Sequence, residues 1–143
     1  MTENNHHAKR LGLSLWFRLA RFYTHSIRRT NQHLKEWGLS ASQFDILVQV
    51  GVHNRLTQQE LADKLFVTKG NVTQMINKME QLGWIKREQE WKTKYLSLTD
   101  TGAALYKEVV PPQEQFQAEQ FSKLTTEEQK QLLILLRKLQ KED

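Results

Sequence analysis

The chain has 143 residues, of which 38% are hydrophobic, and a formal net charge of +5, so we expect one domain, 1–143, with a core of its own. It holds no cysteine, which excludes disulfides, zinc–thiolate sites and thiol-based redox sensing. It has neither a signal peptide nor a run of about 18 apolar residues, so a cytoplasmic location and no membrane contact are expected.

The positive charge is concentrated in one fifth of the chain. Residues 64–94 hold seven Lys/Arg against three acids, whereas the segment before them holds eight against five and the segment after them six against eight. Such a concentration is typical of an element that binds a polyanion. Charge alone leaves an ordinary solvated surface as an open alternative.

The first expected element is a long helix from Leu11 to Trp37, preceded by a polar arm of about nine residues without periodicity. Apolar residues recur along the helix three or four positions apart. They are Leu11, Leu15, Leu19, Phe22, Tyr23, Ile27, Leu34 and Trp37. Gly38 is expected to end the helix.

Three short helices are expected next, because each of three apolar segments follows a capping signal. The signals are Ser40 with Gln43, Thr57 with Glu60, and Thr68 alone. The first of these helices is predicted to run to about Val52. The third is predicted to end at Gly83, since glycine readily takes the left-handed conformation that closes helices.

A basic β-hairpin is expected at 84–98, where alternation replaces helical spacing. Its strands are predicted at Trp84–Arg87 and Lys94–Leu98, around a long polar tip from Glu88 to Thr93. The residues predicted to face inward are Ile85, Leu96 and Leu98, and those predicted to face outward are Lys86 and Ser97.

Two further helices are expected after the hairpin. Thr99 is predicted to cap the first, which Pro111 and Pro112 should kink or divide because their rings remove backbone donors. Thr125 and Glu128 form a capping box for the last helix, which is rich in leucine.

The helix that follows Thr68 has two chemically different faces. At 100° per residue, five apolar residues fall within a roughly 120° arc and are predicted to be buried. They are Val72, Met75, Ile76, Met79 and Leu82. The residues predicted to read DNA bases are Gly70, Asn71, Thr73, Gln74, Asn77, Lys78 and Gln81. Asn and Gln can bond adenine N7 and N6, and Thr can contact thymine, so an A·T-rich site is expected.

Other residues are predicted to contact the DNA backbone and the minor groove. Thr68 and Lys69 lie at the start of the helix, where free amides and a lysine would meet phosphate. The hairpin residues predicted to meet DNA are Lys86, Arg87, Trp91, Lys92, Thr93 and Lys94. A basic tip can reach a minor groove that A·T tracts narrow. Trp91 would stack or wedge there, or else pack on the hairpin or a neighbouring helix.

Leu56 to Leu105 resembles the winged helix-turn-helix regulators of the MarR (multiple antibiotic resistance regulator) family. The resemblance is carried by LTQQELADKL, VTQMINKMEQLGWIKR and LSLTDTGAAL, which look like the family's third helix, recognition helix and wing-to-helix junction. It implies a mainly α (α+β) fold with a DNA reader at 40–99 and dimerisation helices at 11–38 and 100–143. It also implies a homodimer that binds pseudo-palindromic double-stranded DNA. At the wing tip Glu90, Trp91 and Lys92 stand where the family commonly has Asp-Arg-Arg.

The resemblance further implies a small effector, often aromatic and anionic, between the dimerisation helices and the reader. Candidate lining residues are Trp16, Leu19, Tyr23, His25 and Phe44, with Arg18 or Arg21 near the mouth. The alternative is that this aromatic stripe is simply core. No metal site and no cofactor are predicted, since His25 and His33 lie eight residues and about 80° apart on a helix.

The sequence therefore predicts a homodimeric transcriptional repressor that a small ligand releases from DNA. The alternative is an architectural or accessory DNA-binding protein without a sensing function. An enzyme is not expected, because the chain has no glycine-rich phosphate loop, HExxH motif, GxSxG motif or cysteine nucleophile.

Overall fold

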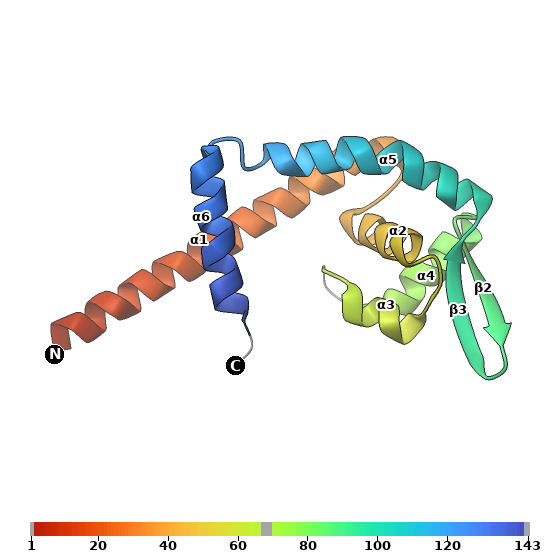
Figure 1. Cartoon of the computed structure of the whole chain (residues 1–143), viewed down its shortest axis with the longest axis horizontal. Helices are drawn as coiled ribbons and strands as arrows, with labels where there is room; N and C mark the ends of the chain where they lie inside the picture. Colours follow the sequence, from red (N-terminus) through yellow and green to blue (C-terminus); the bar gives the residue numbers. More distant parts are fainter. Residues whose placement is uncertain (1, 67–69, 142–143) are drawn as a thin grey trace.

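The computed structural model describes residues 2–66 and 70–141 (Figure 1). Helices dominate these residues, and a small antiparallel sheet completes the fold. The elements are α1 (Thr2–Leu34), a 3-10 helix η1 (Lys35–Trp37), α2 (Ala41–His53), β1 (Leu56–Thr57), α3 (Gln58–Lys64), α4 (Val72–Gln81), β2 (Ile85–Glu90), β3 (Thr93–Leu98), α5 (Asp100–Glu119) and α6 (Thr126–Gln140). The predicted mainly α fold with a β-hairpin is confirmed.

Helix α1 begins at Thr2, so the prediction of an irregular polar arm before Leu11 is wrong. The first residues contain neither glycine nor proline, and extending a formed helix costs little once its first turn exists. Only Thr30 and Leu34 of α1 are buried. Helix α1 ends at Leu34 and passes into η1. Gly38, with φ of +72°, donates its backbone N–H to the Lys35 carbonyl at 3.0 Å and ends η1, which places the helical stop where it is predicted.

Two of the predicted capping boxes are complete. The Ser40 hydroxyl accepts the Gln43 N–H at 3.1 Å, and the Gln43 side chain accepts the Ser40 N–H at 2.9 Å. Thr125 and Glu128 form the same pair of bonds at the start of α6.

The third box is formed only in part. The Thr57 hydroxyl accepts the Glu60 N–H at 3.1 Å, but the Glu60 carboxylate bonds that hydroxyl rather than the backbone N–H. Thr57 also ends strand β1, which pairs with β3 and was not predicted, because two residues are too short for an alternation to be visible.

Helix α4 closes as predicted at Gly83, which has φ of +83°. The Gly83 N–H donates to the Glu80 carbonyl and the Trp84 N–H donates to the Met79 carbonyl, both at 3.0 Å. This pair of bonds is a Schellman motif, which satisfies carbonyls left free at the end of a helix.

The sheet has the order β1-β3-β2, with both pairings antiparallel. Ile85 pairs with Leu98 and Lys86 with Ser97, in the predicted register, but the ladder continues to Glu90 and Thr93. The predicted long tip is therefore wrong, and only Trp91 and Lys92 connect the strands. The outer part of the hairpin is polar and shows no apolar alternation, so the pattern does not predict it as strand. Backbone hydrogen bonds nevertheless pair these residues.

Helix α5 begins at the predicted cap, where the Thr99 hydroxyl accepts the Gly102 N–H at 3.0 Å. The prolines Pro111 and Pro112 lie inside α5 and do not divide it. Val109, Val110 and Gln113 are buried on either side of them, and this packing offsets the lost backbone bonds.

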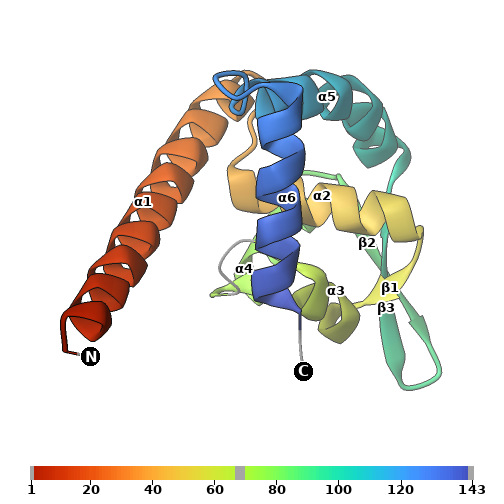
Figure 2. The same ribbon diagram turned by 60° about the vertical axis from the view of Figure 1, so that its left-hand side comes forward.

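The hydrophobic core lies among α2, α3, α4, the sheet and α5, and the C-terminal end of α1 closes it through Leu34. By contrast, α6 buries no residue, and α1 projects away from the core (Figures 1 and 2). The hairpin and the N-terminal end of α1 lie at opposite ends of the long axis (Figure 1). No helix within the described residues combines the length and apolar character that crossing a membrane requires.

Candidate nucleic-acid interface

Helix α4 presents one apolar face to the core and one polar face to solvent. Val72, Ile76 and Met79 are buried and Met75 is half-buried, as the angular arc predicts. Leu82 was also predicted to be buried but is 45% exposed, because α4 ends before it. The exposed residues include every predicted base reader in the described chain: Gly70, Asn71, Thr73, Gln74, Asn77, Lys78 and Gln81.

The helix begins at Val72, later than the Thr68 cap predicts. Thr68 and Lys69 lie outside the described residues. Asn71 occupies the N-cap position with φ of +59°, and its side chain makes no capping bond. The first amides of α4 therefore receive no side-chain acceptor from the cap residue, and such free amides favour a bound anion.

Two side chains from neighbouring elements hold residues of this polar face. The Gln58 amide donates to the Thr73 hydroxyl at 2.8 Å. Arg87 of β2 donates from Nη2 to Asn77 Oδ1 at 2.5 Å. Arg87 is predicted to meet DNA on the wing, and in this structure its side chain contacts α4. This orientation could have been predicted from the sequence, because strand alternation places residue 87 on the same face as the inward Ile85.

The hairpin of residues 84–98, here called the wing, carries lysines with and without an ion-pair partner among the described residues. Lys92, Thr93 and Lys94 are exposed at its far end, whereas the Lys86 Nζ lies 3.4 Å from a Glu88 carboxylate oxygen. Trp91 is 92% exposed and has φ of +59°. Its exposure removes the alternative that the ring packs on the hairpin or a neighbouring helix.

Arg55, in the turn before β1, braces the wing from the side. Its guanidinium bonds the Glu90 carboxylate and lies over the Tyr95 ring, 3.8 Å from the ring centroid. The hydrogen bond to Glu90 raises the pKa of Arg55. Sequence reasoning missed this brace, because nothing local relates position 55 to positions 90 and 95.

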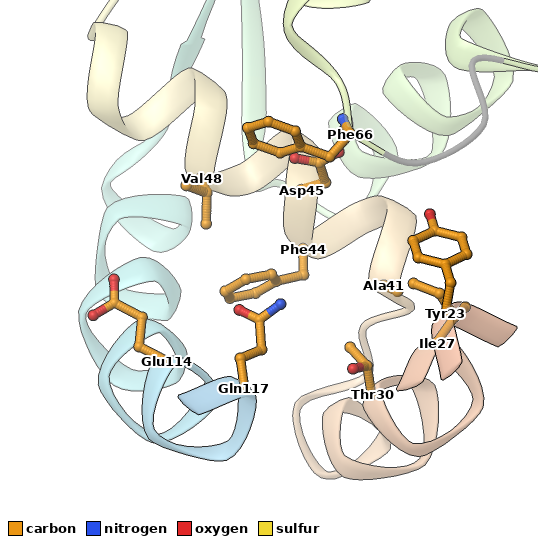
Figure 3. Close-up of a pocket in the computed structure, with 10 residues that line it drawn as sticks. All are labelled: Tyr23, Ile27, Thr30, Ala41, Phe44, Asp45, Val48, Phe66, Glu114 and Gln117. Atoms are coloured by element: carbon orange, nitrogen blue, oxygen red, sulfur yellow. Dashed lines mark hydrogen bonds between the residues drawn. The ribbon is translucent and has the colours of Figure 1, made fainter. Parts of the chain in front are cut away.

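A cavity of about 310 Å³ lies between α1, α2 and α5 (Figure 3). Its lining residues are Tyr23, Ile27, Thr30, Ala41, Phe44, Asp45, Val48, Phe66, Glu114 and Gln117. Of the predicted lining residues, Tyr23 and Phe44 line it, and Phe44 projects from α2 beside Gln117 of α5 (Figure 3).

The other predicted pocket residues do not line this cavity. Trp16, Leu19 and His25 lie elsewhere on α1, and Trp16 is 69% exposed. The physical reason is that α1 leaves the body of the molecule on the N-terminal side of Tyr23. Arg18 and Arg21 are not part of the lining either, which contains the carboxylates of Asp45 and Glu114.

Within the described residues, no group of three or more His, Asp or Glu side chains is arranged to hold a metal ion. His33 has a different role, since its Nδ1 bonds the Gln113 side-chain oxygen at 2.7 Å. Its ring also stacks on Phe116, with 4.3 Å between centroids. His33 therefore joins α1 to α5.

The sequence profile of the MarR family matches residues 37–90, which contain α2 to β2. An uncharacterized HTH-type transcriptional regulator of Bacillus cereus (strain ATCC 10987) is 42% identical over 132 residues, 92% of this chain and 90% of that protein. The chain belongs to the MarR family.

Two further matches extend this result. The transcriptional repressor MprA of Escherichia coli (strain K12) is 29% identical over 118 residues, 79% of this chain and 67% of MprA. A mutant MarR from E. coli, crystallised with operator DNA, has a similar fold, with a TM-score of 0.76 and 26% identity over 88% of this chain and 93% of that one. The chain is thus a DNA-binding transcriptional regulator with a winged helix-turn-helix, as the sequence predicts.

Proposed function

We propose that this MarR-family regulator is a homodimeric, sequence-specific repressor whose DNA binding a small molecule releases. The observation that carries the proposal is the open polar face of α4 beside the wing. Lys78, Lys92 and Lys94 have no ion-pair partner in the part of the chain that the structure describes. The related MprA is a transcriptional repressor, and the related MarR binds operator DNA.

In the proposed complex, α4 enters the major groove. Its exposed amide and hydroxyl groups read base edges, and the free amides at its start meet phosphate together with Thr68 and Lys69. The wing follows the backbone to the adjacent minor groove, where Lys92 and Lys94 neutralise phosphates. Gln74 and Gln81 retain both atoms of their amides for adenine, which supports an A·T-rich operator.

The homodimer is supported by apolar side chains that a single chain leaves in solvent. On α1 they include Leu11, Leu15, Trp16 and Phe17, and on α6 they include Leu133, Ile134, Leu135 and Leu139. Extended exposed apolar surfaces of this kind mark protein interfaces. Two subunits would hold their α4 helices about 34 Å apart, the spacing of successive major grooves on one face of DNA, so the operator should be pseudo-palindromic.

The proposed effector site is the cavity between α1, α2 and α5. A ligand there would touch both the helices of the proposed dimer interface and α2 of the reader. The ligand lowers DNA affinity by binding a dimer with misaligned α4 helices more tightly than the dimer that fits DNA. The loss of DNA affinity cannot exceed this difference in ligand affinity. Because the lining combines aromatic rings with the carboxylate of Glu114, aromatic compounds that are neutral or cationic fit it better than anions.

Selection of DNA from a random library by the purified protein tests the repressor's reading function. We expect an inverted repeat with half-site centres about 10 base pairs apart and A·T-rich half-sites. Enrichment of no common sequence, or of G·C-rich sites without a repeat, would contradict the proposal.

Thermal unfolding with aromatic ligands of different charge tests the effector. A ligand that binds the native dimer raises the midpoint, and it should also weaken operator binding. If neutral, cationic and anionic aromatics all leave the midpoint unchanged, the protein is better described as a DNA binder that does not sense.

A further inference from the structure

Arg87 lies between the wing and the polar face of α4. It stands two residues after Ile85 on β2, so both side chains point to the same side of the strand. Ile85 is 1% exposed and Arg87 is half-buried. The Arg87 side chain therefore follows the inward face of β2 to α4, and its bond to Asn77 lies at the exposed edge of that contact.

The contact between Arg87 and Asn77 determines which way the Asn77 amide points. Arginine has five N–H donors and no acceptor. The atom 2.5 Å from Arg87 Nη2 must therefore be the Asn77 side-chain oxygen. The amide NH₂ then points away from Arg87, and it has no protein partner among the described residues.

Glu80 holds the guanidinium in this position. Its Oε2 lies 3.9 Å from Arg87 Nε, an ion pair without a hydrogen bond, and that Nε is closed off from solvent. Glu80 follows Asn77 by three residues and so lies on the same side of α4. The carboxylate thus positions Arg87, and Arg87 positions Asn77.

We propose that Arg87 is a positioning residue that restricts Asn77 to one role on DNA, that of a hydrogen-bond donor. The inference rests on the proposed entry of α4 into the major groove. The two-bond contact with adenine needs both the oxygen and the NH₂ of the amide. Arg87 occupies one of the two lone pairs of that oxygen and fixes the plane of the amide. In this proposal the guanidinium also blocks the approach of adenine to the second lone pair, so Asn77 does not make the two-bond contact.

The remaining NH₂ group favours base edges that offer acceptors. Guanine offers O6 and N7 without a neighbouring donor, and thymine offers O4, whereas cytosine presents its N4 amino group. One base pair in each half-site should therefore prefer guanine or thymine, even within an A·T-rich operator. Thr73 is not restricted in the same way, because a hydroxyl both donates and accepts.

The test compares the DNA selected by the wild-type protein with that selected by Asn77→Asp and Arg87→Ala. Asn77→Asp keeps an oxygen for Arg87 but turns an acceptor toward the DNA. At one base pair its preference should move to cytosine or adenine, changing the affinity ratio about fivefold or more, the worth of one base hydrogen bond. Arg87→Ala leaves both atoms of the Asn77 amide available, so the selected DNA should contain adenine more often at the same base pair.

Two further variants are matched controls. Lys86→Ala removes the same charge at the neighbouring position. Lys86 pairs with Glu88, and strand alternation places it on the opposite face of β2 from Arg87. This variant should weaken binding to all sequences alike. Arg87→Lys retains a donor and should keep the wild-type preference. Thermal midpoints of all variants are measured first, so that a folding defect is recognised.

The outcomes separate this inference from the proposed function. A wild-type protein that selects no common sequence contradicts the proposed function itself. A defined wild-type operator that Asn77→Asp and Arg87→Ala both leave unchanged overturns the role of Arg87 alone. That role is also overturned if Arg87→Ala and Lys86→Ala alter the selected sequence in the same way.

Discussion

Lys92 and Lys94 differ from Lys86 in their surroundings, although all three lie on the wing. Lys86 has a carboxylate partner, whereas the other two have none in the described chain. A cation that neutralises a phosphate releases a counterion, which makes binding depend on salt. We therefore expect the three lysines to contribute unequally to DNA affinity.

Lys92→Ala and Lys94→Ala should each lower the slope of log affinity against log salt concentration by about 0.9. Fluorescence anisotropy at several salt concentrations measures this slope. Lys86→Ala is the control and should lower it less, because its charge is already partly neutralised by Glu88. Equal slopes for all three variants would contradict a phosphate-binding role for the wing tip.

Trp91 stands in an unfavourable backbone conformation at the wing tip. It is the first residue of the two-residue turn and has φ of +59°, a region in which asparagine or glycine is usual. Because its ring is exposed, folding gains little from its packing. A bulky residue kept in such a conformation is expected to serve a contact outside the folded chain.

Trp91→Asn should raise the free energy of unfolding by about 1 kcal/mol, since asparagine tolerates the left-handed region. Urea unfolding at a fixed protein concentration checks this. The same variant should bind operator DNA more weakly, and Trp91→Phe should bind more tightly than Trp91→Asn. A variant that is both less stable and unchanged in DNA binding would count against this interpretation.

The wing and α5 are joined at one residue. The Thr99 hydroxyl accepts the Gly102 N–H and donates to the Gly83 carbonyl, so it caps α5 and holds the turn that ends α4. Gly102 packs directly against the backbone of Trp84, and a Cβ at this position would come 2.0 Å from the Trp84 carbonyl oxygen. This close approach fixes the base of the wing against the start of α5.

Thr99→Ala should lower the free energy of unfolding by about 1–2 kcal/mol, the upper range for a lost N-cap, because a second bond is lost as well. Thr99→Ser keeps the hydroxyl and is the control. Urea denaturation of both variants gives the comparison. If the serine and alanine variants lose the same stability, the hydroxyl is not the stabilising group.

At the scale of the whole molecule, two helices leave apolar surface uncovered. Helix α6 buries none of its residues, and α1 buries only two. The two regions are far apart in sequence, and both lie on the side of the molecule away from the hairpin (Figure 1). A second subunit that covers both would also determine the distance between the two α4 helices.

Replacing Leu135 and Leu139 together by glutamine should shift the protein from dimer to monomer and weaken operator binding. Light scattering measures the mass, and the wild-type midpoint of thermal unfolding should rise with protein concentration. Leu82→Gln, at an exposed leucine outside α1 and α6, is the control and should remain dimeric. A wild-type protein that is monomeric at all concentrations would contradict the proposed dimer.

The sequence alone determined features that depend on residues close together in the chain. The caps at Ser40, Thr99 and Thr125 and the helix stops at Gly38 and Gly83 were predicted, since each is a contact across three or four residues. The burial of Val72, Ile76 and Met79 on α4 followed from helical geometry, whereas that of Leu82 did not, because the helix ends before it. The family followed from motifs that span the reader.

Only the tertiary structure decided features that join distant residues. Packing of the elements brings Arg87 into contact with Asn77 and Glu80, and it brings Arg55 to Glu90 on the wing. It also makes Glu114 and Gln117 line the cavity, which Trp16 and Leu19 do not. The tertiary structure also shortened the wing tip and extended α1 to Thr2. Local patterns record which face of an element is apolar, but the partner that each polar side chain meets depends on how the elements pack.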